Sequence, residues 1–306
     1  MRLYMALITL SLIWGTSFYF IKILVEEIGP WGIVFLRCTL GAFTLLLIII
    51  FQKRKFQLKE LPWKALVLVG FLNALIPWGL IAISEMKISS SLASIVNATT
   101  PIWTSVIGVL IFSVTLNFKQ WAGVMIGFLG ILVLIDLDPV QLFKEDLIGM
   151  GTMIAATLCY GFSSQFTKRH LQGISVMIIS VMTLLVGALG SLLIMTFTGA
   201  SLSVQSFSFD IIGALIGLGV FGSGLAYLLF YYMIQKGSAE FATFVTYLVP
   251  ITAMVWGWLL LDEHIPPHAI YGLLMIFIGV YLSTRKTVKS HQATSKTINK
   301  KQRGII

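Results

Sequence analysis

Nine aromatic and amide side chains lie within strongly apolar stretches of the chain, where their polar tips could contact a solute. An aromatic ring offers an apolar face, and an indole N–H, a phenol O–H or an amide adds a directional hydrogen bond. That combination is typical of a cavity that binds amphiphilic solutes reversibly. Each residue alone could instead pack or anchor an interface, because Trp and Tyr concentrate at membrane surfaces. The set comprises Trp14, Asn73, Trp78, Asn97, Tyr160, Gln165, Tyr227, Tyr231 and Tyr247.

Arg37 is the charged residue that lies deepest within an apolar stretch. An arginine at the centre of a bilayer costs about 2.5 to 3.5 kcal/mol on insertion scales, so it should face protein, water or a solute. It could hold an anionic group of a solute or pair with a carboxylate. It could also play a structural role by extending its charged end to the interface. The sequence leaves these interpretations open.

Three further residues could serve gating or coupling. Pro101 and Pro250 each fall in mid-stretch, where proline removes a backbone hydrogen bond and leaves a free carbonyl one turn earlier, near Asn97 and Thr246. Such bends could flex beside a cavity, or they could be static kinks that improve packing. Glu263 ends an apolar stretch and is the nearest candidate for a proton-binding carboxylate, although a structural role at a helix end suits it equally.

Patterns for catalysis, metal binding or nucleotide binding are absent from the sequence. It contains no HExxH or GxSxG motif and no Walker-type phosphate loop. The two cysteines, Cys38 and Cys159, fall inside apolar stretches and look like buried side chains. We therefore expect no catalytic residue, no cofactor, no metal site and no direct use of ATP. A membrane-embedded enzyme is the competing class, and it would need clustered acids, histidines or a nucleophile with its base.

The elements that carry these residues are apolar helices. The chain is 58% hydrophobic and 11% charged, whereas an ordinary soluble domain has about 25% charged residues. Strands of a membrane barrel would alternate between apolar and polar residues, but stretches such as 40–51 are apolar all round. We expect an all-α integral membrane protein, with about 20 residues per crossing. Its ten predicted spans are 3–21, 33–51, 65–84, 92–113, 120–135, 148–166, 175–197, 211–233, 241–261 and 269–283.

The distribution of charge predicts how these spans are oriented. With ten spans, both termini share one side of the membrane, and 17 of the 21 Lys and Arg residues flank the spans on that side. The positive-inside rule then predicts cytoplasmic termini in a multi-pass protein of the cell membrane. Most acidic residues, Glu85 among them, flank the spans on the opposite side. Residues 285–306 form a basic cytoplasmic tail beside membrane lipid. The same rule accounts for the net charge of +9 without nucleic acid as a partner.

The chain also contains an internal repeat. Shifting it by 149 residues aligns 78–133 with 227–282 without a gap, and an offset of 146 pairs Trp14-Gly15 with Tyr160-Gly161 and Lys22 with Lys168. Each half has five spans, an odd number, so the second half is predicted to lie inverted relative to the first. Inverted repeats are common in secondary transporters. The predicted units are 1–138, 147–284 and the tail. Identical residues at the 149 offset include Lys87/Lys236, Ser89/Ser238, Ala93/Ala242, Pro101/Pro250, Gly108/Gly257, Gly123/Gly272 and Gly130/Gly279.

Glycine and proline interrupt the third and eighth spans at corresponding places. The third contains Gly70, Asn73 and Pro77, and the eighth contains five glycines between 213 and 224. Loosened turns at matching positions in two halves would expose backbone groups to a solute. The same small residues could merely permit close packing of helices.

These features resemble the drug/metabolite transporter superfamily, specifically its ten-helix family with two EamA domains. The resemblance covers about residues 5–284, and one departure is that Val114 stands where the second half has Glu263, so any role of that carboxylate is not symmetric. Its motifs are Ile13-Trp14-Gly15-Thr16-Ser17-Phe18, Phe35-Leu36-Arg37, Gly237-Ser238-Ala239, Tyr247-Leu248-Val249-Pro250 and Leu261-Asp262-Glu263.

The resemblance implies export or facilitated passage of amino acids, related metabolites or toxic compounds, with a small molecule as substrate. Import of a vitamin, sugar or nucleoside fits the same residues. The coupling ion stays open as well: protons are one candidate, and a facilitator without coupling is another.

Overall fold

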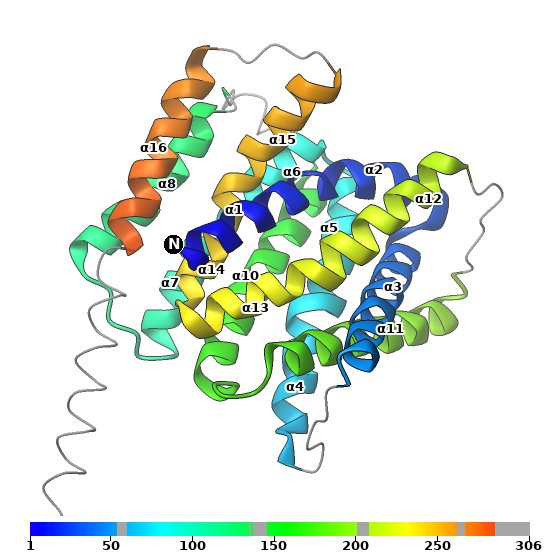
Figure 1. The fold of residues 1–306 in the computed structure, drawn as a ribbon. Helices are drawn as coiled ribbons and strands as arrows, with labels where there is room; N and C mark the ends of the chain where they lie inside the picture. The colour runs from blue at the N-terminus through cyan, green and yellow to red at the C-terminus, as the bar shows by residue number, and fades with distance from the viewer. Residues whose placement is uncertain (54–59, 135, 137–145, 201–207, 262–266, 285–306) are drawn as a thin grey trace, which may run out of the picture.

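The structure is a computed structural model that describes residues 1–53, 60–134, 136, 146–200, 208–261 and 267–284, and these residues are helical with short connections (Figure 1). No strand occurs within the described ranges, which confirms the all-α prediction. The helices of the first part are α1 (Arg2–Gly15), α2 (Ser17–Ile28), α3 (Pro30–Phe51), α4 (Trp63–Gly70), η2 (Phe71–Leu75), α5 (Ile76–Glu85), α6 (Ser90–Asn97), α7 (Thr100–Leu110) and α8 (Phe118–Leu134).

The helices of the second part repeat the π-helical interruption, although its first span is one unbroken helix where the first part has α1 and α2. They are α10 (Leu147–His170), α11 (Val176–Thr198), α12 (Phe209–Ile216), η3 (Gly217–Leu225), α13 (Ala226–Lys236), α14 (Ala239–Thr243), α15 (Val245–Leu261) and α16 (Pro267–Thr284).

Every predicted span has a helical counterpart among these elements. Eight described segments are long and apolar enough to cross a bilayer, and two shorter apolar helices, Phe118–Leu134 and Pro267–Ser283, correspond to the fifth and tenth predicted spans. Large apolar side chains such as Phe43, Leu189 and Phe277 point outward, as in a protein surrounded by lipid. The chain is therefore a multi-pass membrane protein, and the crossing of its two short helices stays a prediction.

The predicted interruptions of the third and eighth spans are present as π-helical turns. η2 joins α4 to α5, and the longer η3 joins α12 to α13. The cause in η3 is its composition, since Gly217, Gly219, Gly222 and Gly224 all fall within it. In η2 the cause is Pro77, two residues beyond the turn, whose missing N–H loosens the helix before it.

Glycine brings α8 and α16 into backbone contact along one edge of the bundle, where the two helices run side by side (Figure 1). A Cβ added at Gly279 would lie 2.5 Å from the Gly127 nitrogen and 2.6 Å from the Gly123 oxygen. A Cβ at Gly130 would lie 2.8 Å from the Gly272 oxygen. This glycine seam lets two membrane helices approach more closely than any side chain would allow.

Several contacts recur at the offsets of the sequence repeat. Lys22 Nζ donates to the Glu85 carbonyl at 2.7 Å, at the C-terminal end of α5. Lys168 Nζ donates to the carbonyls of Gln235 and Gly237 at 3.1 and 2.8 Å, at the equivalent end of α13. A lysine at a helix C-terminus satisfies orphan carbonyls and complements the negative end of the helix dipole.

Replacing Gly279 with alanine should destabilise the protein, because the added methyl group would meet the backbone of α8. We expect a loss of about 1 to 3 kcal/mol, the usual cost of overpacking. Thermal unfolding in detergent would measure it. Gly213→Ala is the matched control, since nothing lies within 4 Å of a Cβ there. Equal midpoints for the two variants would contradict close packing at the seam.

Replacing Lys168 with methionine should lower thermal stability by about 1 to 2 kcal/mol, because two carbonyls at the end of α13 lose a charged donor. Methionine keeps most of the apolar stem, so the change isolates the ammonium group. Lys236→Met, at an exposed lysine on the same helix end, is the control. If Lys236→Met is as damaging as Lys168→Met in a thermal unfolding assay, the capping interpretation is wrong.

Candidate functional site

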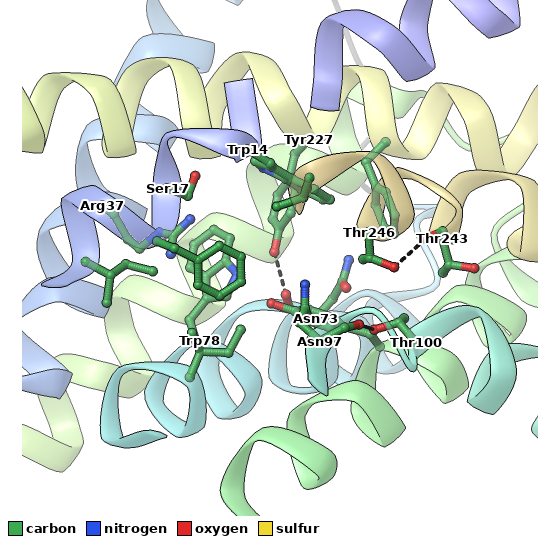
Figure 2. Close-up of a pocket in the computed structure, with 16 residues that line it drawn as sticks. Trp14, Ser17, Arg37, Asn73, Trp78, Asn97, Thr100, Tyr227, Thr243 and Thr246 are labelled. Carbon is green, nitrogen blue, oxygen red and sulfur yellow. Dashed lines mark hydrogen bonds between the residues drawn. The ribbon is translucent and has the colours of Figure 1, made fainter. Parts of the chain in front are cut away.

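A cavity of about 630 Å³, its open mouth included, lies among helices from both parts of the chain (Figure 2). α1, α2, α3, η2, α5, α6 and α7 contribute to its wall from the first part, and α10, α13, α14 and α15 from the second. Its lining is mostly aromatic and aliphatic, with a few polar groups. The lining residues are Trp14, Ser17, Phe18, Ile21, Arg37, Asn73, Trp78, Ile81, Asn97, Thr100, Tyr160, Tyr227, Phe230, Thr243, Thr246 and Val249.

Backbone carbonyls of the two π-helical turns anchor aromatic side chains of this wall. Pro77 cannot donate to the Asn73 carbonyl four residues earlier, and the Tyr227 hydroxyl donates to that oxygen instead (Figure 2). In η3 the Gly222 carbonyl accepts a hydrogen bond from Trp14 Nε1 at 3.0 Å. Asn73 and Gly222 are equivalent at the 149-residue offset. Each loosened turn therefore exposes one carbonyl, and an aromatic side chain satisfies it.

Trp78 and Tyr227, also equivalent at that offset, stack on one another in the centre of the cavity wall. Their ring centroids are 5.1 Å apart with an interplanar angle of 28°. Tyr227 also packs against Phe230, whose ring lies 5.5 Å from that of Trp14. The aromatic wall is thus continuous from the first part of the chain to the second. It offers flat apolar surface to a bound solute.

Arg37 is buried, with 4% of its surface exposed. Its Nε donates to Ser223 Oγ at 3.1 Å, and its guanidinium carbon lies 3.5 Å from the centre of the Trp78 ring. Such cation–π contact strengthens when it is desolvated. The α3–η3 packing holds the side chain inside the bundle, at the cavity, and its depth in the membrane stays a prediction.

Seven of the ten residues that the sequence suggested for substrate contact line this cavity, and three do not. Tyr231 lies behind the wall, where its hydroxyl accepts from Asn73 Nδ2 at 2.7 Å and bonds Thr183 Oγ1 at 2.8 Å. The seven lining residues are Trp14, Arg37, Asn73, Trp78, Asn97, Tyr160 and Tyr227.

Gln165 and Tyr247 lie away from the cavity and join helices. Gln165 Nε2 donates to Glu240 Oε1 at 2.6 Å and to the Thr104 carbonyl at 2.9 Å, which ties α10 to α14 and α7. The Tyr247 hydroxyl donates to the Val124 carbonyl at 2.8 Å, and its ring lies against Gly127, so it fastens α15 to α8. Both side chains stabilise the bundle in this structure.

The two prolines differ in their surroundings. Pro250 lies inside α15, as predicted. Pro101 does not lie in mid-helix: the predicted span 92–113 divides into α6 and α7, and Pro101 occupies the first turn of α7, where its N–H would have no partner within that helix. The carbonyl of Asn97 is not free either, since Thr100 Oγ1 donates to it at 2.6 Å. Glu263 lies outside the described residues.

Glu85 ends α5, at the end of a span as expected, but it is not exposed. Its side chain is fully buried, because α2 and α6 pack over the end of α5. Oε2 accepts a hydrogen bond from Ser90 Oγ at 2.7 Å, whereas Oε1 has no hydrogen-bond partner among the described residues. A second charged residue besides Arg37 is therefore buried among the described helices.

Sequence reasoning missed nine of the lining residues, although helical spacing could have found most of them. Side chains three, four or seven residues apart share a helix face. Ser17, Phe18 and Ile21 follow Trp14 at those spacings, Ile81 follows Trp78, Thr100 follows Asn97, and Phe230 follows Tyr227. Thr243, Thr246 and Val249 form another such row on the ninth span, but none of them is aromatic or an amide.

Tyr231→Phe should destabilise the protein by about 1 to 3 kcal/mol, because it leaves the buried Asn73 amide without its acceptor. Tyr232→Phe removes the same atom from the neighbouring, half-buried position and is the control. Thermal unfolding of both variants in detergent would test the difference. A neutral Tyr231→Phe would mean that Asn73 needs no support from α13.

Comparison with known proteins agrees with this architecture. A solved crystal structure superposes on 94% of this chain and 98% of its own, with a TM-score of 0.75 at 14% sequence identity, which is a likeness of fold. The chain is 24% identical over 283 residues to the uncharacterized transporter YoaV of Bacillus subtilis, covering 92% of this chain and 97% of that one. It is also 24% identical over 309 residues to the uncharacterized inner membrane transporter YedA of Escherichia coli, covering 94% of each.

The model of the EamA-like transporter family matches twice, over residues 1–136 and 147–285. These matches include every element that lines the cavity. The chain belongs to the EamA-like transporter family.

Proposed function

We propose that this chain is a secondary transporter of the cell membrane that exports amino acids or related small metabolites by alternating access. The observation that carries the proposal is the cavity, whose wall is built from equivalent positions of the two family-matched halves. Trp14 and Tyr160, Trp78 and Tyr227, and Asn97 and Thr246 all face it in such pairs. A small-molecule substrate would bind between the halves, where secondary transporters place their sites.

The proposal includes an inverted arrangement of the two halves. Each half contributes five apolar helical segments, so a second half inserted after the first would have the opposite orientation in the membrane. Two kinds of contact that occur in both halves support this arrangement. A Cβ at Gly15 would lie 3.1 Å from the Ala253 nitrogen, and a Cβ at Gly161 would lie 3.0 Å from the equivalent Thr104 nitrogen. The lysine caps of α5 and α13 recur in the same way.

Alternating access needs elements that bend in both halves, and the breaks of the fourth and ninth spans are suited to this. α6 ends at Asn97 before α7 begins at Thr100, and α14 ends at Thr243 before α15 begins at Val245. Pro101 lies in the first turn of α7, directly after the first break, and Pro250 lies inside α15, six residues beyond the second, so each removes one backbone hydrogen bond near its break. We place the gating movement at these two breaks.

The proposal also includes an orientation in the membrane and a candidate driving force. Both termini lie in the cytoplasm by the positive-inside rule. Protons are the candidate coupling ion, with Glu263 as the carboxylate to test. Exchange without a gradient would make the protein a facilitator.

Purified protein in liposomes loaded with unlabelled amino acids should accumulate labelled amino acid by counterflow. Stimulation by an imposed pH gradient would establish coupling to protons. A membrane enzyme would not exchange an unmodified solute, so absence of counterflow across a panel of amino acids and small metabolites would contradict the proposal.

Filling the cavity should abolish the exchange. Thr246→Trp places a large side chain at a buried position of the wall, whereas Leu189→Trp adds the same group at an exposed position. We expect counterflow to fall at least tenfold for the first variant and to stay at the wild-type rate for the second, at equal levels in the membrane. Equal activity of the two variants would place the transport route elsewhere.

A further inference from the structure

Arg37 is oriented by contacts that use only a small part of its hydrogen-bonding capacity. Nε bonds to Ser223 Oγ, and Ser223 in turn donates to the Leu218 carbonyl at 2.8 Å, so the hydroxyl is itself held by η3. The guanidinium plane rests on Trp78. Of its five N–H donors, the four on the terminal nitrogens form no hydrogen bond with the described residues. The side chain is therefore fixed while its two terminal nitrogens remain available.

The charge of Arg37 also lacks a counter-ion in the described part of the chain. The one ion pair found there joins Lys87 to Asp146, and neither residue lines the cavity. The described cavity lining contains no acidic side chain. A buried charge without a partner is costly, and arginine in a membrane segment is normally paired. An anion that enters the cavity would supply the missing partner and gain a forked, bidentate contact.

Two further groups of the wall lack hydrogen-bond partners among the described residues. Ser17 Oγ is buried and unpaired, and Figure 2 shows it beside Arg37 at one end of the cavity. Asn97 Oδ1 is buried and unpaired toward the other end. The hydroxyls near Asn97 are already used, since Thr100 Oγ1 donates to the Asn97 carbonyl and Thr246 Oγ1 to the Thr243 carbonyl. Buried polar atoms are usually paired, and of the nine unpaired side-chain atoms among the described residues these two line the cavity, where a ligand would supply a partner.

The described cavity lining carries one cationic side chain, Arg37, and it comes from the first half. The position equivalent to Arg37 at the 146-residue offset is Thr183, whose hydroxyl is bonded to Tyr231 behind the wall. The second half therefore offers no cation to match Arg37. A cavity lined from two related halves is therefore positively charged at one end only.

We propose that the substrate carries one carboxylate, which Arg37 and Ser17 bind, and a hydrogen-bond donor, which Asn97 Oδ1 accepts. The aromatic wall of Trp78 and Tyr227 holds the apolar body between them. This inference rests on the proposed function and narrows it: zwitterionic amino acids and hydroxy acids fit, whereas amines without a carboxylate and dianions do not. Arg37 sets the preference for an acid, and Asn97 sets the preference for a donor on the same molecule.

The test uses matched probes that differ in one group: L-phenylalanine, L-phenylalaninamide and 3-phenylpropionate, with the corresponding leucine set. Binding is measured in chloride-free detergent solution by thermal stabilisation of the purified protein, and transport is measured by counterflow in liposomes. Wild type should bind phenylalanine more tightly than its amide by at least ~30-fold, the loss usual when a buried charge partner is removed. Phenylpropionate should bind with intermediate affinity.

Variants separate the roles of the two ends. Arg37→Gln should weaken binding of both acids by at least ~30-fold and leave the amide unchanged. Arg37→Lys should restore part of the acid preference. Arg169→Gln, at an exposed arginine of α10, should behave as wild type. Asn97→Leu should remove the advantage of phenylalanine over phenylpropionate without affecting the acid-to-amide ratio.

The outcomes distinguish this inference from the proposed function. If wild type binds or exchanges the amide as well as the acid, the carboxylate site is wrong even though the transport proposal stands. This comparison of probes on the wild-type protein also tests the carboxylate site if the Arg37→Gln variant fails to insert. If acids bind in an Arg37-dependent manner and no solute moves, the site stands and the transport proposal fails. Stabilisation by no member of either set would overturn the carboxylate site.

Discussion

The backbone of a membrane-spanning helix has to satisfy every carbonyl, since lipid offers no donor. In this protein two π-helical turns each leave a carbonyl without its helical donor. Aromatic side chains of the cavity wall donate to these two carbonyls instead. The Asn73 oxygen is freed by Pro77 and takes the Tyr227 hydroxyl, while the Gly222 oxygen takes the indole N–H of Trp14. Both donors are wall residues, so the helix irregularities and the aromatic surface determine one another. Removing either turn would release a side chain that faces the solute.

The same interactions join the two parts of the chain. Tyr227 lies in α13 and reaches back to η2, while Trp14 lies in α1 and reaches forward to η3. Each donor therefore belongs to the part opposite its acceptor, and the cavity forms only when both are folded. Arg37 follows this pattern through Ser223 of η3. Its burial depends on the π-helical turn of the other part, which explains how a charge is tolerated so deep in an apolar bundle.

Much of this could be predicted from the sequence, because apolar runs and helical spacing report directly on membrane helices. The segments, the interruptions and the aromatic residues that meet at the cavity came from such patterns. These patterns did not predict which polar side chains are buried against other helices. Glu85 reads as a residue flanking a span, yet the short α5–α6 turn folds α6 over it. Gln165 and Tyr247 share the residue types of the wall but face other helices. Only the packing of distant segments separates these cases.

The glycine seam between α8 and α16 has a consequence for how such a sequence can diverge. Glycine is the smallest residue, so any mutation at Gly279 or Gly272 adds at least one carbon to a space already occupied by backbone. At core positions filled by leucine or valine, other apolar residues of similar volume can be substituted and the core can repack around them. At the glycine seam no substitution of this kind is expected to leave stability unchanged. We expect inherited variation to accumulate on the lipid-facing surfaces of these two helices, while their shared edge stays fixed.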